Sequence, residues 1–208
     1  MDTLTAIFGT EAKVKILRLF LFNPETPFFP AEVAKRTKCP SSAVRKELAT
    51  LANANILKKR MASKEPPAAS GSKQPARKLR GLGYAMNERF EYLEPLKNLL
   101  TVSTVPADES LLKRFGGCGR LKLFMASGIF IQNWDARVDL LVVGDELNLH
   151  KLEGMIKDIE AEFGKEISYS AFETQDFEYR FGIHDRLIRD ILDYPHITLL
   201  DRLGVEPH

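Results

Sequence analysis

The side chains of this sequence best suited to a defined chemistry are a cluster of cations that could bind a polyanion. Between residues 35 and 80 there are 13 basic residues and only two acidic ones, Glu47 and Glu65. Such an excess over a short segment is typical of nucleic-acid contact, because lysine and arginine bind phosphates. A solvated charged face is the plain alternative for any run of this kind.

The most specific part of this cluster lies at the start of a helix expected from about residue 42 to 51. Its apolar residues Val44, Leu48 and Leu51 share one face and would dock inward. The residues left outward at the N-terminal end are Ser41, Ser42, Arg45 and Lys46. A DNA-recognition helix needs both faces, and its arginine can donate two parallel hydrogen bonds to guanine. Whether Arg45 meets a base or a phosphate stays open.

Further cations lie on two strand-like stretches, at about residues 56–60 and 77–86. They are Lys58, Lys59, Arg60, Arg77, Lys78 and Arg80. On the two arms of a hairpin these side chains would contact the phosphate backbone and make affinity depend on salt. The intervening tract, 63–75, is rich in Pro, Ala, Ser and Gly. We expect a tolerated loop there; a tip that orders on DNA is the alternative.

Other chemistry finds little support in the sequence. The glycine-rich stretch 116–119 lacks the Lys-Ser/Thr of a phosphate-binding loop, and the four histidines have no zinc spacing. Two cysteines, Cys39 and Cys118, exclude a disulfide framework. No apolar run approaches the length of a membrane helix, and the N-terminal residues lack a signal-peptide pattern. We therefore expect a cytoplasmic protein with no membrane contact.

The elements that position the cations follow a recognisable order. A helix is expected over residues 11–22, with Thr10 as its N-cap and Asn23-Pro24 as its stop. A short helix from about Pro30, the helix at 42–51 and the two strand-like stretches come next, before a closing helix at 93–100. Three helices followed by a β-hairpin is the order of a winged helix.

The second half differs in charge and in pattern. Residues 1–100 carry 18 basic and 9 acidic side chains, whereas residues 101–208 carry 12 and 19. Helices are expected at 109–115, 149–163 and 177–192. They alternate with strands at 121–126, 138–143, 167–172 and 197–200, which indicates an α/β domain. Only the first half is therefore expected to meet a polyanion.

Residues 8–100 resemble the winged-helix domain of prokaryotic regulators, of the kind joined to a minimal nucleotidyltransferase-fold domain. The residues that carry the resemblance are FGTEAKVKILRLFLFNP, EVAKRTKCPSSAVRKELATLANANILKKR and LEPLKNLL. The resemblance implies an α+β protein of two domains. Residues 1–100 would form a winged helix-turn-helix, and residues 107–208 a small nucleotidyltransferase-like domain with a mixed sheet.

The resemblance also implies where a catalytic site would lie in the second domain. That family carries a Gly-Ser pair after the first strand, two aspartates that begin the next, and a third carboxylate on a later strand, which hold two metal ions. Here the corresponding residues are Ala126-Ser127-Gly128, then Arg137 and Asp139, then Ser168. Two of three carboxylates are missing and one is replaced by a cation, which repels divalent ions. We expect no catalysis, no metal and no cofactor.

Two roles remain open for Asp139. The favoured one is structural, as a capping residue or as the ion-pair partner of Arg137. The other is that Ser127, Gly128, Arg137, Asp139 and Ser168 still line a pocket that binds a nucleotide as an effector.

Together these observations predict a transcriptional regulator whose first domain binds double-stranded DNA. The second domain would serve dimerisation, effector sensing or partner contact, and a homodimer is expected because one small module buries little DNA surface. One alternative is an active nucleotidyltransferase that modifies a protein or RNA, with the winged helix for targeting. Another is an adaptor whose winged helix no longer binds DNA.

Overall fold

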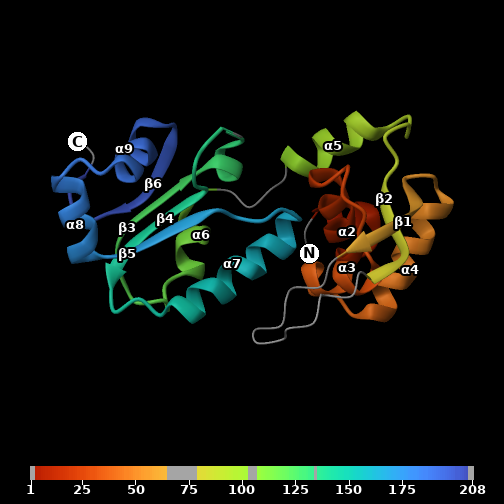
Figure 1. The fold of residues 1–208 in the computed structure, drawn as a ribbon, viewed down its shortest axis with the longest axis horizontal. Helices are drawn as coiled ribbons and strands as arrows, with labels where there is room; N and C mark the ends of the chain where they lie inside the picture. The colour runs from red at the N-terminus through yellow and green to blue at the C-terminus, as the bar shows by residue number, and fades with distance from the viewer. Residues whose placement is uncertain (1–2, 65–78, 103–106, 134, 206–208) are drawn as a thin grey trace. The chain divides into compact units, whose positions relative to one another are not determined.

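A computed structural model describes residues 3–64, 79–102, 107–133 and 135–205 (Figure 1). These residues form nine α-helices, a two-stranded sheet and a four-stranded mixed sheet. The chain divides into two compact units. One comprises Met1–Val102 with Ala161–Lys165, and the other Ser103–Glu160 with Glu166–His208.

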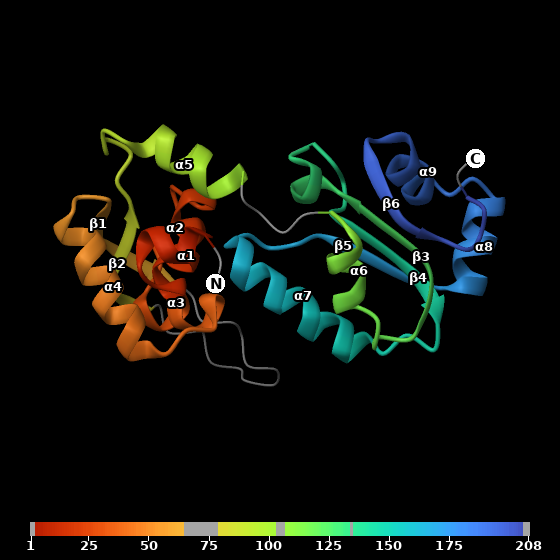
Figure 2. The same cartoon turned by 180° about the vertical axis from the view of Figure 1, so that it is seen from behind.

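The first unit contains five helices and a hairpin. Helix α1 (Thr3–Phe8) is followed by α2 (Glu11–Phe22), α3 (Pro30–Thr37) and α4 (Ser41–Asn53). Strands β1 (Leu57–Lys64) and β2 (Leu79–Met86) form the hairpin, and α5 (Leu93–Val102) ends the unit. Figures 1 and 2 show α4 beside the hairpin, and α4 contacts β1. Helix α1 is the element that the sequence did not predict.

Helix α2 forms the centre of this unit. It begins after Thr10, whose hydroxyl accepts a hydrogen bond of 3.1 Å from the Lys13 amide, and it ends at Asn23, so both predicted ends are confirmed. Its apolar residues are buried with those of α3, α4 and the hairpin. The Arg18 guanidinium donates a hydrogen bond of 3.1 Å to the Leu100 carbonyl, which ties α5 to α2.

The turn between α3 and α4 fixes the direction of α4. Helix α3 starts with Pro30 in its first turn, as predicted, and the Glu32 carboxylate accepts a hydrogen bond of 2.9 Å from the Phe29 amide. At the other end Lys38 adopts a left-handed conformation (φ 53°) that breaks the helix. Pro40 then precedes the first turn of α4 and suits the extended approach to it.

The hairpin pairs β1 with β2 in antiparallel register, from Leu57 opposite Met86 to Lys64 opposite Leu79. Phe28 adds a bridge on the outer side of β2 through hydrogen bonds of 2.8 and 2.9 Å with Tyr84. Gly83 permits this approach, because a Cβ there would lie 3.1 Å from the Phe28 carbonyl oxygen. The base of the hairpin is therefore held to the helices, since Leu57 and Met86 belong to the core.

The second unit is built on the four-stranded sheet. Its elements are α6 (Glu109–Arg114), β3 (Arg120–Ser127), the 3₁₀ turn η1 (Gly128–Ile131), β4 (Leu140–Asp145), α7 (Leu149–Phe163), β5 (Tyr169–Glu173), α8 (Thr174–Gly182), α9 (Arg186–Asp193) and β6 (His196–Asp201). The strand order is β5-β4-β3-β6. Strands β4 and β5 are parallel, whereas β3 is antiparallel to both β4 and β6, so the predicted mixed sheet is confirmed.

Both faces of this sheet are covered. On one face Leu123, Met125, Leu141 and Val143 pack against Phe177 of α8 and against Ile188 and Ile191 of α9. On the other, the ring of Phe124 lies 5.0 Å from that of Phe115, which follows α6. Burial on both sides explains the continuous apolar run of β4, Leu140–Val143.

One predicted element is wrong. A single helix was expected over residues 177–192, but the chain forms α8 and α9 with a break between them. His184 is left-handed (φ 56°), and the Asp185 carboxylate accepts hydrogen bonds of 2.9 and 3.3 Å from the Leu187 and Ile188 amides. Asp185 therefore caps a new helix and does not continue the previous one.

None of the helices in the described part of the chain is both long enough and apolar enough to span a lipid bilayer.

Candidate nucleic-acid interface

Helix α4 has two distinct faces. Val44, Leu48 and Leu51 are buried against the rest of the first unit, as predicted. On the outer face of the N-terminal turns, the side chains of Ser41, Ser42, Arg45 and Lys46 are all exposed. Among the described residues, none lies within ion-pair distance of the Arg45 guanidinium or the Lys46 ammonium group. These two cations are therefore available to an external anion.

The N-terminus of α4 adds unsatisfied donors to these cations. The helix was expected to start near Ser42 with serine caps, but it starts at Ser41 with Pro40 in the cap position. Proline has no side-chain acceptor, so the amides of the first three residues keep their donors free, while Val44 bonds to the Pro40 carbonyl at 3.0 Å. The first turn carries no acidic residue. Free amides and the positive end of the helix dipole favour a phosphate at this position.

The one carboxylate of α4, Glu47, is turned away from this face. Its side chain is buried, where it accepts a hydrogen bond of 2.9 Å from the Thr10 hydroxyl and lies 3.4 Å from the Lys13 ammonium group. Glu47 is one of only two acidic residues between positions 35 and 80, and the other, Glu65, lies outside the described residues. The exposed turns of α4 are therefore more positive than the sequence count indicates.

The predicted cations of the hairpin differ in their surroundings. Lys59, Arg60 and Arg80 are exposed, and no described carboxylate pairs with them. Lys58 points to the other side of β1 from Lys59, is half-buried, and has its ammonium group 3.6 Å from Glu88. Arg77 and Lys78 lie outside the described residues, as does most of the 63–75 tract. Whether all these cations form one surface with Arg45 stays a prediction.

Sequence reasoning missed two apolar residues on the hairpin. Met61 and Leu82 face each other across the strands and are exposed by 69% and 50%. Strand alternation places them on the same face as Lys59 and Arg80. The signal that could have found them is the spacing Lys59-x-Met61, which puts an apolar side chain beside a cation on one face. The outer part of the hairpin thus presents apolar and positive groups together.

The second candidate cluster lies where β3 ends and β4 and β5 begin. Asp139 is buried, and its two carboxylate oxygens accept hydrogen bonds of 2.8 Å each from the amides of Ile129 and Ser168. Its own amide donates to the Ser168 carbonyl at 2.6 Å. Asp139 therefore joins the turn after β3 to the start of β5, which is the structural role that the sequence favoured.

Ser127 and Gly128 also take part in this junction between the turn after β3 and the start of β5. The Ser127 hydroxyl donates to the Val138 carbonyl, and its amide donates to the Asp139 carbonyl at 2.8 Å. Gly128 is left-handed (φ 56°), and a Cβ there would lie only 2.0 Å from Asp139 Oδ1. Glycine is thus required by the approach of Asp139. Ser168 is exposed and contributes its backbone groups.

Arg137 does not join this cluster. Its Nε lies 3.0 Å from the Asp190 carboxylate of α9, and the predicted pairing with Asp139 is therefore wrong. Asp190 could not be anticipated as the partner because it is 53 positions away in the sequence. Of the five residues predicted to line a nucleotide pocket, four meet at the junction and Arg137 reaches away from it.

No group of three or more His, Cys, Asp or Glu side chains within the described ranges is arranged to hold a metal ion. Cys118 is fully buried, and this burial raises the pKa of its thiol despite an opposing effect of Lys151. A raised pKa lowers the fraction of reactive thiolate, so Cys118 is a poor nucleophile.

No family model matches this chain, and no curated protein and no solved structure is significantly similar to it. The resemblance to winged-helix regulators with a nucleotidyltransferase-like domain therefore stays a prediction. The function is inferred from the chain's own side chains and their contacts.

Proposed function

We propose that this chain is a DNA-binding transcriptional regulator whose first unit is a winged helix-turn-helix. The order of elements supports this, since α2, α3 and α4 are followed by the β1–β2 hairpin, with Phe28 bridged to β2. In such a domain the second helix of the helix-turn-helix enters the major groove with its N-terminal residues toward the bases. Helix α4 would take that role, with the hairpin as the wing.

The observation that carries the proposal is the outer face of α4. Ser41, Ser42, Arg45 and Lys46 are exposed there, next to free amides, while Glu47 is turned inward. The exposed N-terminal turns of α4 therefore carry positive charge alone, because Glu47 is held inward by Thr10 and Lys13. For a groove lined by phosphates the same arrangement is favourable, because each cation adds attraction and no carboxylate opposes it.

The hairpin extends this surface in the proposal. Lys59 and Arg80 would contact phosphates on the face where Met61 and Leu82 add apolar contact, whereas Arg60 would reach the DNA only from the opposite face of β1, which it shares with Lys58. Proteins that enter the minor groove commonly combine cations with apolar side chains in this way. Lys58 would contribute less, because Glu88 already neutralises it.

The second unit would serve dimerisation or effector sensing in this regulator. Asp139 supports a non-catalytic role, because each of its carboxylate oxygens accepts a hydrogen bond from a backbone amide and no group of three metal-ligating side chains lies there among the described residues. The transferase alternative would require further carboxylates beside Asp139, because this chemistry uses two metal ions held by several carboxylates. We therefore propose a unit that keeps its fold through this junction and acts through binding.

The proposal is tested by measuring binding of the full chain to a fluorescently labelled duplex over a series of salt concentrations. The logarithm of the affinity should fall linearly with the logarithm of salt concentration. Replacing Arg45 by alanine should weaken binding and reduce this slope by about one if Arg45 meets a phosphate. If it meets a base, Arg45→Ala should instead lower the preference among sequences, by about 1–3 kcal/mol at the contacted position.

Arg202→Ala supplies the matched control, because Arg202 is an exposed arginine of the second unit. This variant should bind duplex as the wild type does. Duplex binding that is absent, or that responds equally to Arg45→Ala and Arg202→Ala, would exclude the proposed interface. In that case the adaptor alternative would be favoured.

A further inference from the structure

The second unit exposes a group of large apolar side chains between residues 179 and 197. They are Tyr179, Phe181, Ile183, Tyr194 and Ile197. Exposed apolar residues scattered singly are ordinary, whereas a patch of them that is contiguous in space is typical of an interaction surface. Tyr179 and Phe181 lie near the end of α8 and Ile183 directly after it, while Tyr194 follows α9 and Ile197 lies on β6, so these residues flank α9 along the chain.

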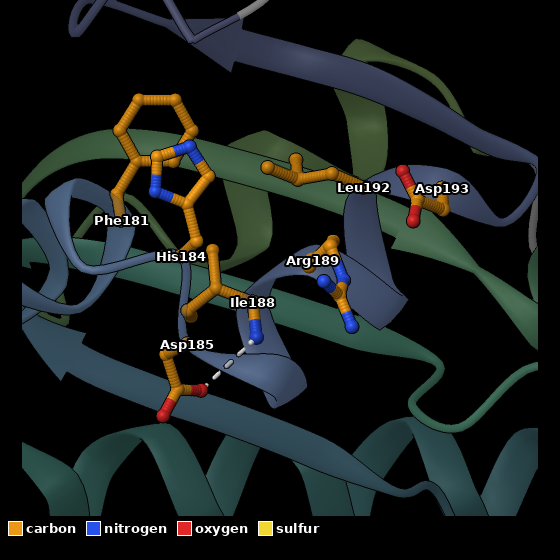
Figure 3. Close-up of a pocket in the computed structure, with 7 residues that line it drawn as sticks. All are labelled: Phe181, His184, Asp185, Ile188, Arg189, Leu192 and Asp193. Atoms are coloured by element: carbon orange, nitrogen blue, oxygen red, sulfur yellow. Dashed lines mark hydrogen bonds between the residues drawn. The ribbon is translucent and has the colours of Figure 1, made fainter.

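A hollow of about 100 Å³ lies on this surface. Figure 3 shows Phe181 and His184 at one end and Leu192 and Asp193 at the other, with Ile188 and Arg189 between them. Its lining combines apolar side chains with charged side chains of both signs. Asp185 also lines it, but its carboxylate is already bound to the first amides of α9, so this helix end offers no free site for a phosphate. The hollow therefore suits a side chain better than an anion.

The charges of α9 run against its dipole. Arg186 and Arg189 lie in its N-terminal half, whereas Asp190 and Asp193 lie in its C-terminal half. A helix dipole favours acidic residues near the N-terminus and basic residues near the C-terminus, so this arrangement is unfavourable in isolation. An antiparallel helix alongside would make this arrangement favourable. The arginines of each helix would then lie beside the negative C-terminal end and the acidic residues of the other.

Two of these charges have no partner among the described residues. Asp190 is engaged by Arg137 at 3.0 Å and by Arg186 at 3.8 Å, but neither Arg189 nor Asp193 forms an ion pair. They stand one helical turn apart on the outer side of α9, opposite the buried Ile188 and Ile191. An arginine four positions before an acid is the weaker order for pairing within one helix. Both charges are therefore free for a second molecule.

We infer that α9 is the interface of a symmetric homodimer, in which it packs antiparallel against α9 of a second copy. A two-fold axis brings the same surface to both sides, so residue pairs form reciprocally. Arg189 would face Asp193 of the second copy, and Asp193 would face its Arg189. Exposed apolar side chains from the end of α8, such as Phe181 and Ile183, would fill the hollow of the opposite molecule.

A second copy fits this surface because the two-fold axis places Arg189 of each copy opposite Asp193 of the other. A partner of one sign would leave either Arg189 or Asp193 facing a like charge, which is costly at an interface. The inference rests on the proposed assignment of dimerisation to the second unit. It does not require that the first unit bind DNA, so the two can fail separately.

The test is the mass of the full chain in solution, measured by light scattering over a range of protein concentrations. The monomer has a mass of 23.5 kDa, and the wild type should approach twice this value as concentration rises. Arg189→Glu places two like charges opposite each other in both halves of the interface, as does Asp193→Arg. Each variant should raise the dimer dissociation constant by about tenfold or more.

The double variant Arg189→Glu with Asp193→Arg restores opposite charges at both positions and should restore the dimer. Lys157→Glu, an exposed charge reversal on α7, is the matched control and should dimerise as the wild type does. Circular dichroism and melting temperature identify any variant that loses the dimer by unfolding, and the two single variants test the pair from opposite sides.

A wild type that stays monomeric at all concentrations would overturn the inference. A dimer that survives both single reversals would also overturn it, because another surface would then hold the subunits. Single variants that are folded and monomeric but are not rescued by the double variant would exclude the antiparallel pairing. Duplex binding measured on the same samples reports separately on the proposed function.

Discussion

The carboxylate of Glu47 lies 3.4 Å from the ammonium group of Lys13, which joins the middle of α4 to the first turn of α2. Thr10 completes the contact, since its hydroxyl donates to Glu47 and accepts from the Lys13 amide. Thr10 thus caps α2 and also forms a hydrogen bond with Glu47 of α4. Through this contact a buried acid fixes the rotation of the helix whose opposite face carries Arg45 and Lys46.

Replacing Glu47 by alanine should lower the free energy of unfolding by about 1–3 kcal/mol, because the Thr10 hydroxyl and the Lys13 ammonium both lose a buried partner. Glu47→Gln should cost less, since an amide oxygen can still accept from Thr10. Chemical denaturation measures both. Glu25→Ala, in the exposed turn after α2, is the control, and an equal loss in this variant would contradict the role of Glu47.

The two adjacent lysines of β1 should differ in their effect on DNA binding. Lys59→Ala should weaken duplex binding and lower the salt slope by about one, because an exposed and unpaired cation is lost. Lys58→Ala should change the slope less, since the Lys58 ammonium already lies 3.6 Å from Glu88. Fluorescence anisotropy at several salt concentrations measures the two slopes. Equal changes of the salt slope in the two variants would mean that the side of the strand on which each lysine lies does not affect DNA binding.

The apolar pair of the hairpin should contribute binding that salt does not remove. Replacing Met61 and Leu82 together by serine is expected to weaken duplex binding about fivefold while leaving the salt slope unchanged, because apolar contacts release no counterions. Met61→Leu keeps an apolar side chain and should retain most of the affinity. Should the serine variant bind as tightly as the wild type, the pair lies outside the DNA contact.

Asp139→Asn should destabilise the second unit. An asparagine side chain has one acceptor, so either the Ile129 or the Ser168 amide would face an NH₂ group, at a cost of about 1–3 kcal/mol. Asp135→Asn, in an exposed loop, should cost little. The melting temperatures of the two variants, measured by thermal unfolding, compare these costs.

The same assay tests the nucleotide pocket. Millimolar ATP or GTP with magnesium should leave the melting temperature of the wild type unchanged, because the residues at the junction are committed to one another. A ligand that binds the folded state raises this temperature. A clear rise would favour the effector hypothesis, and transfer of label from ATP that is lost in Asp139→Asn would favour the transferase.

The two cysteines should differ in reactivity. The pKa of the Cys118 thiol is raised by burial, so at a given pH less of it is thiolate, the form that reacts with iodoacetamide. Cys39 is half-buried and should be alkylated first in the native protein, whereas both should react after unfolding. Peptide mass spectrometry after timed alkylation reads this order. Rapid native labelling of Cys118 would show that its site opens.

Sequence signals predicted the elements whose ends are set by neighbouring residues. Helix α2 was predicted to the residue because Thr10 and Asn23-Pro24 act on the adjacent backbone. The break between α8 and α9 was missed for a related reason. The break lies at His184, and a left-handed histidine gives no sequence signal as clear as a glycine does.

The candidate sites also combine features that neighbouring residues determine with features that depend on distant partners. The inward face of α4 follows from helical periodicity, so Val44, Leu48 and Leu51 were predicted correctly. The partner of Arg137 and the inward turn of Glu47 depend on elements that meet only in the folded chain. Asp190 lies 53 residues from Arg137, and Thr10 lies 37 residues from Glu47. Sequence reasoning could place these groups on elements but could not choose their partners.

The contact between Gly128 and Asp139 limits how the second unit can change by single mutations. Any side chain at position 128 would collide with Asp139, and a change at position 139 would leave at least one of two backbone amides without its acceptor. Replacing Arg137 would in turn leave Asp190 of α9 with only the longer contact to Arg186, at 3.8 Å. A single substitution at position 128 or 139 would therefore cost stability unless its partner changed as well. Under the proposed function, this dependence of each residue on its neighbours would keep the second unit in its present fold while residues outside the junction change.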